Sequence, residues 1–195
     1  MFRRVADFHR AVGHSVADQP ALPDSPTRDL RRTLLQEELE EFCAANAAND
    51  RIEMADALAD LCYIIAGTAL DYGIGPGIGP TSQETFESPY DQYLPRPQNP
   101  ATGMADLLRD CYADYEISEQ SDNLSRIDLS LMNMLTTIFG VAWRLNIPLN
   151  AVFAEVHRAN MAKILPDGTV LRRHDDKIMK PPDWTPPDIA RVLSG

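Results

Sequence analysis

The chain has 195 residues, with 29 Asp or Glu against 18 Lys or Arg, and a formal net charge of −11. This length fits one domain with a sizeable core. So acidic a chain argues against a general grip on nucleic acid or anionic membrane, both of which call for basic surfaces, and favours a small-molecule partner. No stretch reaches the roughly 18 apolar residues of a membrane span, and the first residues lack the apolar run of a signal peptide. Together with three widely separated cysteines, these features predict a cytoplasmic protein.

Apolar residues recur every three or four positions along most of the chain, a spacing that predicts helices. The first expected helix is short and covers residues 1–13. The second opens at Ser25, expected as the N-cap with Pro26 in the first helical position, and runs to about Ala48. The third covers residues 50–73 and ends on a glycine, which suits a left-handed cap.

Residues 73–102 are rich in Gly and Pro and predict an irregular excursion. The glycine-rich run is not expected to cradle phosphate, because its prolines lack the N–H donors that such a cradle needs. Helical spacing returns over residues 103–117, 121–146 and 150–164, and a proline-rich basic tail covers 165–195. Because no strand beyond a short hairpin around Val170 is expected, the predicted class is all-α.

Two acidic clusters, on the second and third expected helices, are the most informative feature of the sequence. On the second helix, three glutamates fall within an arc of roughly 100° that borders the apolar stripe, and on the third helix three acids form one row. Half-buried like charges persist only when protons or cations neutralise them, and hard oxygen ligands suit Mg²⁺ or Mn²⁺. The predicted metal ligands are Glu37, Glu38, Glu41, Glu53, Asp56 and Asp60.

Some of these acids also have simpler explanations. The run of glutamates could be a solvated helix face, and Glu40, which points away from the others, is the expected surface member. Glu53 could complete a capping box by reaching back to the backbone N–H of Asp50. Asp56 and Asp60 have no such explanation, because Asp is unfavourable within a helix and both are set among Ala, Leu and Ile.

Cations gather near the other end of the chain, from His157 to Lys180. Acids in one segment and cations in another suit a metal-chelated polyphosphate, with the carboxylates on the metal and the cations on the phosphate oxygens. The alternative is an ordinary basic tail that pairs with the acidic body of the same chain.

The segment Glu37-Glu38-x-x-Glu41 followed by Glu53-x-x-Asp56 resembles the EExxE…ExxD signature of the all-α nucleoside triphosphate pyrophosphohydrolases, which are the MazG-like and phosphoribosyl-ATP pyrophosphohydrolase-like proteins. Residues 6–13, 56–61, 153–163 and 180–188 also resemble blocks of the small bacterial and phage branch of this family. The resemblance implies one MazG-like domain over residues 1–195, assembled as a homodimer or a dimer of dimers.

The resemblance further implies that Mg²⁺ or Mn²⁺ binds at the acids, and that a (deoxy)nucleoside triphosphate is cleaved to its monophosphate and pyrophosphate. Glu38 or Glu41 is then the expected catalytic carboxylate that positions the attacking water. A different register of the second motif would make Asp60, and not Asp56, the last ligand. The expected substrate-binding residues are Asn160, Lys163, Arg173, Lys177, Lys180 and Trp184.

The family resemblance does not cover residues 74–137, which are therefore interpreted as an insertion. Residues 62–74 and 135–147 are loosely alike, as though the chain left a family helix and resumed its ending later. The insertion is expected to extend a subunit contact or to close over the base.

The predicted function is control of the nucleotide pool by pyrophosphohydrolysis. A purine substrate, dGTP or GTP, is favoured because Trp143 and Trp184 offer more stacking surface than a compact uracil pocket needs. The alternatives are a dUTP pyrophosphatase of the same fold, a nucleotide- or metal-binding regulatory bundle without turnover, and a purely structural helical oligomer.

Overall fold

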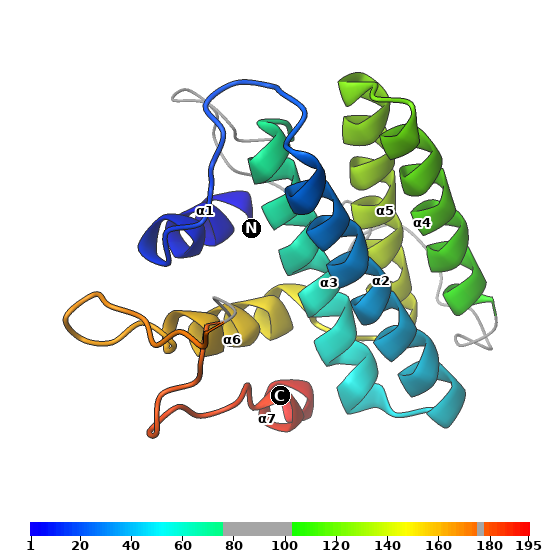
Figure 1. Ribbon diagram of the computed structural model, residues 1–195. Helices are drawn as coiled ribbons and strands as arrows, with labels where there is room; N and C mark the ends of the chain where they lie inside the picture. The colour runs from blue at the N-terminus through cyan, green and yellow to red at the C-terminus, as the bar shows by residue number, and fades with distance from the viewer. Residues whose placement is uncertain (76–102, 175–177) are drawn as a thin grey trace.

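The computed structural model describes residues 1–75, 103–174 and 178–195, and these parts of the chain are all-α, as predicted (Figure 1). Isolated bridges pair Ile164 with Val170 and Arg172 with Ile178, which is the short hairpin expected near Val170. The helices of the described residues are α1 (Phe2–Ala11), α2 (Ser25–Ala48), α3 (Arg51–Tyr72), α4 (Met104–Gln120), α5 (Leu124–Arg144), α6 (Leu149–Met161) and α7 (Ile189–Ser194).

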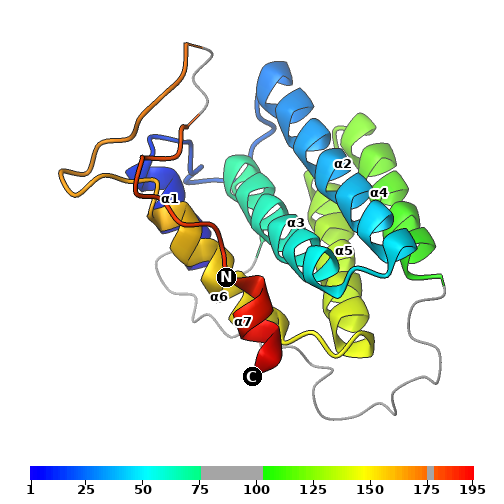
Figure 2. The ribbon, with the colours of Figure 1, turned by 90° about the horizontal axis from the view of Figure 1, so that it is seen from below.

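Two antiparallel hairpins, α2–α3 and α4–α5, pack together as a four-helix bundle. Helix α3 is its most enclosed member, because α1, α6 and α7 cover the side of α3 that faces away from α4 and α5 (Figure 2). In the parts of the chain that the structure describes, no helix combines the length and apolar character needed to cross a membrane.

Local signals explain where α2 and α3 begin and end. The N-cap of α2 is Asp24 and not Ser25, because the Asp24 carboxylate accepts a hydrogen bond from the Thr27 N–H at 3.0 Å and Ser25 is already helical. Helix α2 ends at Asn49, which adopts a left-handed φ of 54°. Asp50 then caps α3 by accepting bonds from two N–H groups of its first turn.

The C-terminal end of α3 is held by the loop that precedes α2. The backbone N–H of Ala17 donates to the Leu70 carbonyl at 2.9 Å, and that of Ala21 donates to the Tyr72 carbonyl at 3.0 Å. Gly73 ends the helix with a φ of 63°, and a Cβ at this position would lie 2.3 Å from the Gln19 carbonyl oxygen. Both the turn and the close approach of the loop therefore require glycine here.

Several predicted boundaries were wrong by a few residues, because fraying and capping decide the last turn more than apolar spacing does. Helix α4 continues three residues past 117, and α5 begins at Leu124 because Asn123 caps it. The short helix α7 in the proline-rich tail was missed, although Asp188 caps it by accepting a hydrogen bond from the Arg191 N–H. Residues 76–102, which are most of the expected irregular excursion and part of the proposed insertion, lie outside the described residues, as does Lys177.

Candidate active site

Helices α2 and α3 pack side by side and bring acidic side chains near one another. Glu38 of α2 and Asp56 and Asp60 of α3 are half-buried, whereas the other three predicted ligands, Glu37, Glu41 and Glu53, are exposed. One carboxylate oxygen of Glu38 and one of Asp56 are buried without a hydrogen-bond partner. Because an unpartnered buried carboxylate oxygen is costly, these two atoms call for a proton or a cation.

The electrostatics show that the two helices share one site. Burial, together with the smaller effects of the charges of Asp60 and Glu41, raises the pKa of Glu38 to about 8. Burial likewise raises the pKa of Asp60 to about 7, with Asp56 adding to the effect and the Lys163 ammonium opposing it. The pKa of Asp56 is also raised, first by burial and then by Glu53 and Glu41. Acids of one helix therefore interact with those of the other.

The simpler explanations account for Glu40 but not for Glu53. Glu40 is exposed and accepts a hydrogen bond from the Gln36 amide at 2.9 Å, as expected of a surface residue. The reciprocal bond of a capping box at Glu53 is not formed, because the Asp50 N–H donates to the Ala45 carbonyl at 2.9 Å instead.

Helix α6 supplies polar groups beside this acidic site. The Lys163 ammonium donates to the Asn160 side-chain oxygen at 2.7 Å and lies near enough to Asp60 to lower its pKa. The Asn160 side chain also interacts with the Tyr63 hydroxyl, which lies 3.1 Å from His157 Nδ1. Sequence reasoning had selected Asn160 and Lys163 but missed Tyr63 and His157, whose contact joins positions far apart in the chain.

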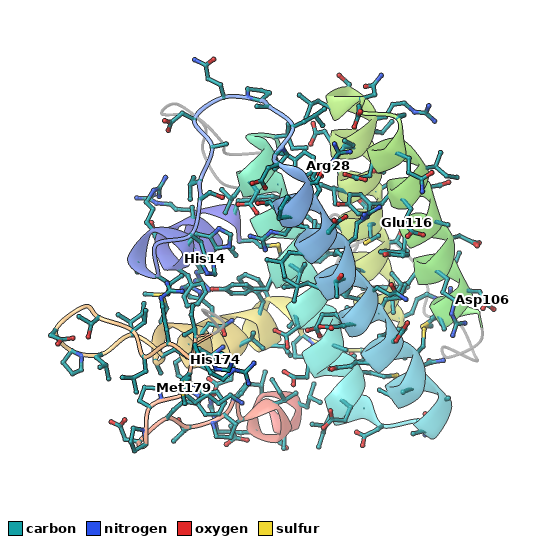
Figure 3. The ribbon with its side chains drawn as sticks, viewed as in Figure 1. His14, Arg28, Asp106, Glu116, His174 and Met179 are labelled. Carbon is teal, nitrogen blue, oxygen red and sulfur yellow. The ribbon has the colours of Figure 1, made fainter. Side chains whose placement is uncertain are left out.

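The other predicted substrate-binding residues lie in the tail. The Trp184 indole N–H donates to the Ala159 carbonyl at 2.7 Å, and the Lys180 ammonium lies 4.2 Å from the centre of the Trp184 ring. These contacts hold the tail against α6 at Ala159, the residue that precedes Asn160. Arg173 is exposed and adjoins His174, which is exposed as well (Figure 3).

The residues present fit a divalent cation. Glu38 and Asp56 offer buried oxygens that lack a partner, and the ligand set is all carboxylate, as Mg²⁺ and Mn²⁺ prefer. In the side-chain conformations described for residues 1–75, 103–174 and 178–195, no three His, Cys, Asp or Glu side chains are close enough to share an ion. Binding would therefore require the carboxylates of α2 and α3 to rotate toward one another.

Comparison with known proteins agrees with this geometry. Residues 5–77, which span α1 to α3 and all six acids, match the family model of phosphoribosyl-ATP pyrophosphohydrolase. That family belongs to the MazG-like nucleotide pyrophosphohydrolase superfamily, to which this segment is therefore similar. The resemblance stated from the acidic motifs is thus confirmed for the part of the chain that carries them, and the superfamily points to a nucleotide pyrophosphohydrolase.

The chain is also similar to a viral protein, Uncharacterized protein L479 of Acanthamoeba polyphaga mimivirus. The two are 26% identical over 179 residues, which cover 84% of this chain and 70% of the viral protein. This similarity extends well beyond the MazG-like segment, so the viral protein shares most of the chain and not only α1 to α3.

The raised pKa values predict a pH dependence of stability for the metal-free bundle. Glu38 and Asp60 have folded-state pKa values of about 8 and about 7, above their values in an unfolded chain. Their contribution to stability is present below the unfolded-state values and is lost as the pH rises from those values to the folded-state values, so the free energy of unfolding should still be falling between about pH 6.5 and about pH 8 and should level off above that. Urea denaturation in EDTA measures this slope.

The same measurement has an internal control. Histidines whose pKa is lowered by burial, His9 and His157, affect stability only below this window. The variant Glu38→Gln removes one of the two titrating carboxyls and should flatten the slope, whereas Glu40→Gln should leave it unchanged. A wild-type stability that is constant or rises with pH over this window would contradict the prediction.

Proposed function

We propose that the protein hydrolyses a (deoxy)nucleoside triphosphate to the monophosphate and pyrophosphate, and so controls the nucleotide pool. The observation that carries the proposal is the pair of buried, unpartnered carboxylate oxygens of Glu38 and Asp56, within a segment that matches a pyrophosphohydrolase family model. Mg²⁺ or Mn²⁺ is the proposed cofactor, and Glu37, Glu38, Glu41, Glu53, Asp56 and Asp60 are the residues that would hold it.

The proposed chemistry is attack of water on the α-phosphorus. A bound divalent ion would neutralise part of the triphosphate charge and acidify water. Glu38 or Glu41 orients the water and accepts its proton as the new P–O bond forms, and the bond from the α-phosphorus to the bridging oxygen breaks to release pyrophosphate. The pKa of Glu38 is raised to about 8 in the metal-free protein, and a bound divalent ion would lower it and leave the carboxylate ionised, as a group that accepts a proton must be.

Helix α6 and the tail face the phosphates in this proposal. Lys163 and Asn160 lie beside Asp60 and would contact phosphate oxygens, because an ammonium and an amide both donate hydrogen bonds to anions. Arg173, Lys177 and Lys180 add positive charge nearby in the sequence. In this arrangement the tail cations contact the substrate phosphates and do not only pair with acids of the same chain.

For the base, we favour a purine, dGTP or GTP, over dUTP. Trp143 is half-buried and lines a pocket of about 370 Å³ with Arg51, two residues before Glu53. An indole at this place offers a stacking surface for a large base. The Trp184 indole N–H already donates to the Ala159 carbonyl, so Trp143 is the residue that favours a purine.

The test is pyrophosphate release from each NTP and dNTP, with Mg²⁺, with Mn²⁺ and with EDTA. The proposal expects metal-dependent release, fastest with dGTP or GTP. Fastest release from dUTP would keep the enzyme class and overturn the purine preference. Binding of a nonhydrolysable triphosphate with no release from any nucleotide would instead indicate a regulatory bundle without turnover.

A further inference from the structure

The α4–α5 hairpin repeats the α2–α3 hairpin at a constant spacing along the chain. Asn49 ends α2 with a φ of 54°, and Asp122, 73 positions later, follows α4 with a φ of 53°. Gly73 ends α3 with a φ of 63°, and Asn146, again 73 positions later, follows α5 with a φ of 56°. Non-glycine residues rarely adopt this conformation. The three that do so in the described residues, Asn49, Asp122 and Asn146, are all members of these two pairs.

Burial follows the same spacing. Phe42 and Tyr115 are both buried, as are Leu35 and Leu108, while the corresponding acids Glu37 and Asp110, and Glu41 and Asp114, are exposed. The N-caps also correspond, since Asp50 opens α3 and Asn123 opens α5. Residues identical across the spacing include the pairs Leu34 and Leu107, Leu58 and Leu131, Ile65 and Ile138, Gly67 and Gly140, and Ala69 and Ala142.

The two hairpins also meet as two copies of one unit would. Helix α2 packs on α4 and α3 packs on α5, whereas α2 does not pack on α5, nor α3 on α4, within the described residues. Each packing contact between the two hairpins therefore joins a helix to its own counterpart, as a two-fold axis would require. The four-helix bundle thus has internal pseudo-two-fold symmetry (Figure 2).

The counterpart of the acidic site has lost most of its carboxylates. The positions of Glu38, Glu53, Asp56 and Asp60 are occupied in the second hairpin by Cys111, Arg126, Leu129 and Asn133. A contact survives there, because the Asn133 amide lies 3.8 Å from Cys111 Sγ, at the positions of the interacting pair Asp60 and Glu38. Only the counterparts of Glu37 and Glu41 remain acidic, as Asp110 and Asp114. Two carboxylates beside a guanidinium are a poor site for a divalent ion.

A pocket of about 420 Å³ lies at this second position, a volume in the range of small-ligand sites. Four of the residues that line it, Asp114, Arg126, Leu129 and Asn133, are counterparts of predicted metal ligands. Arg126 is exposed and makes no ion pair within the described part of the chain. Leu129 is 71% exposed and offers an apolar surface beside this cation.

We propose that the pocket on α4–α5 is a nucleotide-binding site that works without a metal ion, with Arg126 holding the phosphate of a nucleoside monophosphate. A guanidinium binds phosphate through paired N–H groups, and so does directly what a metal ion does in the acidic site. Leu129 packs against the base or sugar, and Ser130 and Asn133 offer polar contacts in the same pocket. The choice of a nucleotide as the ligand rests on the proposed function.

The test is equilibrium dialysis of the full chain with dGMP in EDTA, which removes metal-dependent binding at the acidic site. We expect one dGMP bound per chain and a loss of affinity of about ten-fold or more in Arg126→Glu and in Leu129→Asp. The matched control is Arg109→Glu, which reverses an exposed arginine of α4 outside the pocket and should bind as the wild type does. Arg109 pairs with Asp106, which lies near the first turn of α4, whereas the pocket is lined from Asp114 onward (Figure 3).

Two further ligands show which part of dGMP the pocket binds. Inorganic phosphate should compete with dGMP, and deoxyguanosine should bind at least ten-fold more weakly if Arg126 holds the phosphate. No dGMP binding in EDTA, or binding that Arg126→Glu leaves unchanged, would overturn the proposal. EDTA removes metal-dependent binding at the acidic site, so dGMP binding in EDTA tests only the pocket on α4–α5. A failure of pyrophosphate release would therefore refute the proposed activity without changing the result of this binding experiment.

Discussion

Replacing Glu38 or Glu41 with Gln is expected to lower metal-dependent pyrophosphate release by about 100-fold or more. Gln keeps the shape of the side chain but cannot accept a proton or carry charge, and general base catalysis contributes about 10²–10⁴-fold. Glu38 is the stronger case, because its buried oxygen has no hydrogen-bond partner and its pKa is raised to about 8. The measurement is steady-state pyrophosphate release at saturating Mn²⁺ with the best nucleotide of the panel.

Glu40→Gln is the matched control, because Glu40 lies on the same helix, is exposed and bonds only to Gln36 among the described residues. It should retain wild-type turnover. Stability separates chemistry from folding: Glu38→Gln removes a carboxylate that is unfavourable when ionised, so near pH 8 without metal it should unfold at no lower urea concentration than the wild type. Wild-type turnover in both Glu38→Gln and Glu41→Gln would show that neither carboxylate positions the water.

Much of the helical framework can be predicted from local pattern. Apolar spacing locates α1 to α6, and Asp50 and Gly73 mark the ends of α3 because a side-chain cap and a left-handed glycine act within one helical turn. The start of α2 was misplaced by one residue because Asp24 and Ser25 are both good N-caps and only the geometry selects between them. What apolar spacing could not show is that the region interpreted as an insertion contributes a second hairpin to the same bundle.

The acidic site was predictable in composition but not in its degree of burial. Glu37 and Glu53 share the helix faces of Glu38 and Asp56, yet they are exposed while their neighbours are half-buried. Which acid is desolvated depends on how α2 and α3 cross and on what α6 adds, and neither is written in a single helix. The contact of Tyr63 with His157 was missed for the same reason, since it joins α3 to α6.

Buried charges outside the acidic site were also missed, because their partners are distant in the sequence. Arg31 of α2 donates through Nε to Asp71 of α3 at 2.6 Å, and the side chains are only 9% and 3% exposed. The Ser15 hydroxyl also donates to Asp71, and the ring of His9 lies beside Arg31, where burial and the guanidinium lower its pKa to about 4. The network therefore ties the N-terminal loop to both helices of the acidic hairpin.

Asp71→Asn is expected to lower the free energy of unfolding by about 3–5 kcal/mol, because it leaves the buried Arg31 guanidinium without a counter-charge. Two-state urea denaturation at about pH 7 measures the loss, and Asp29→Asn, which breaks an exposed pair with Arg32, should cost less than about 1 kcal/mol. The double variant Arg31→Met and Asp71→Leu should recover most of the stability, since replacing both charges by apolar groups leaves none unpaired. A cost below about 1 kcal/mol for Asp71→Asn would mean that water reaches Arg31 and that this network does not hold the hairpin together.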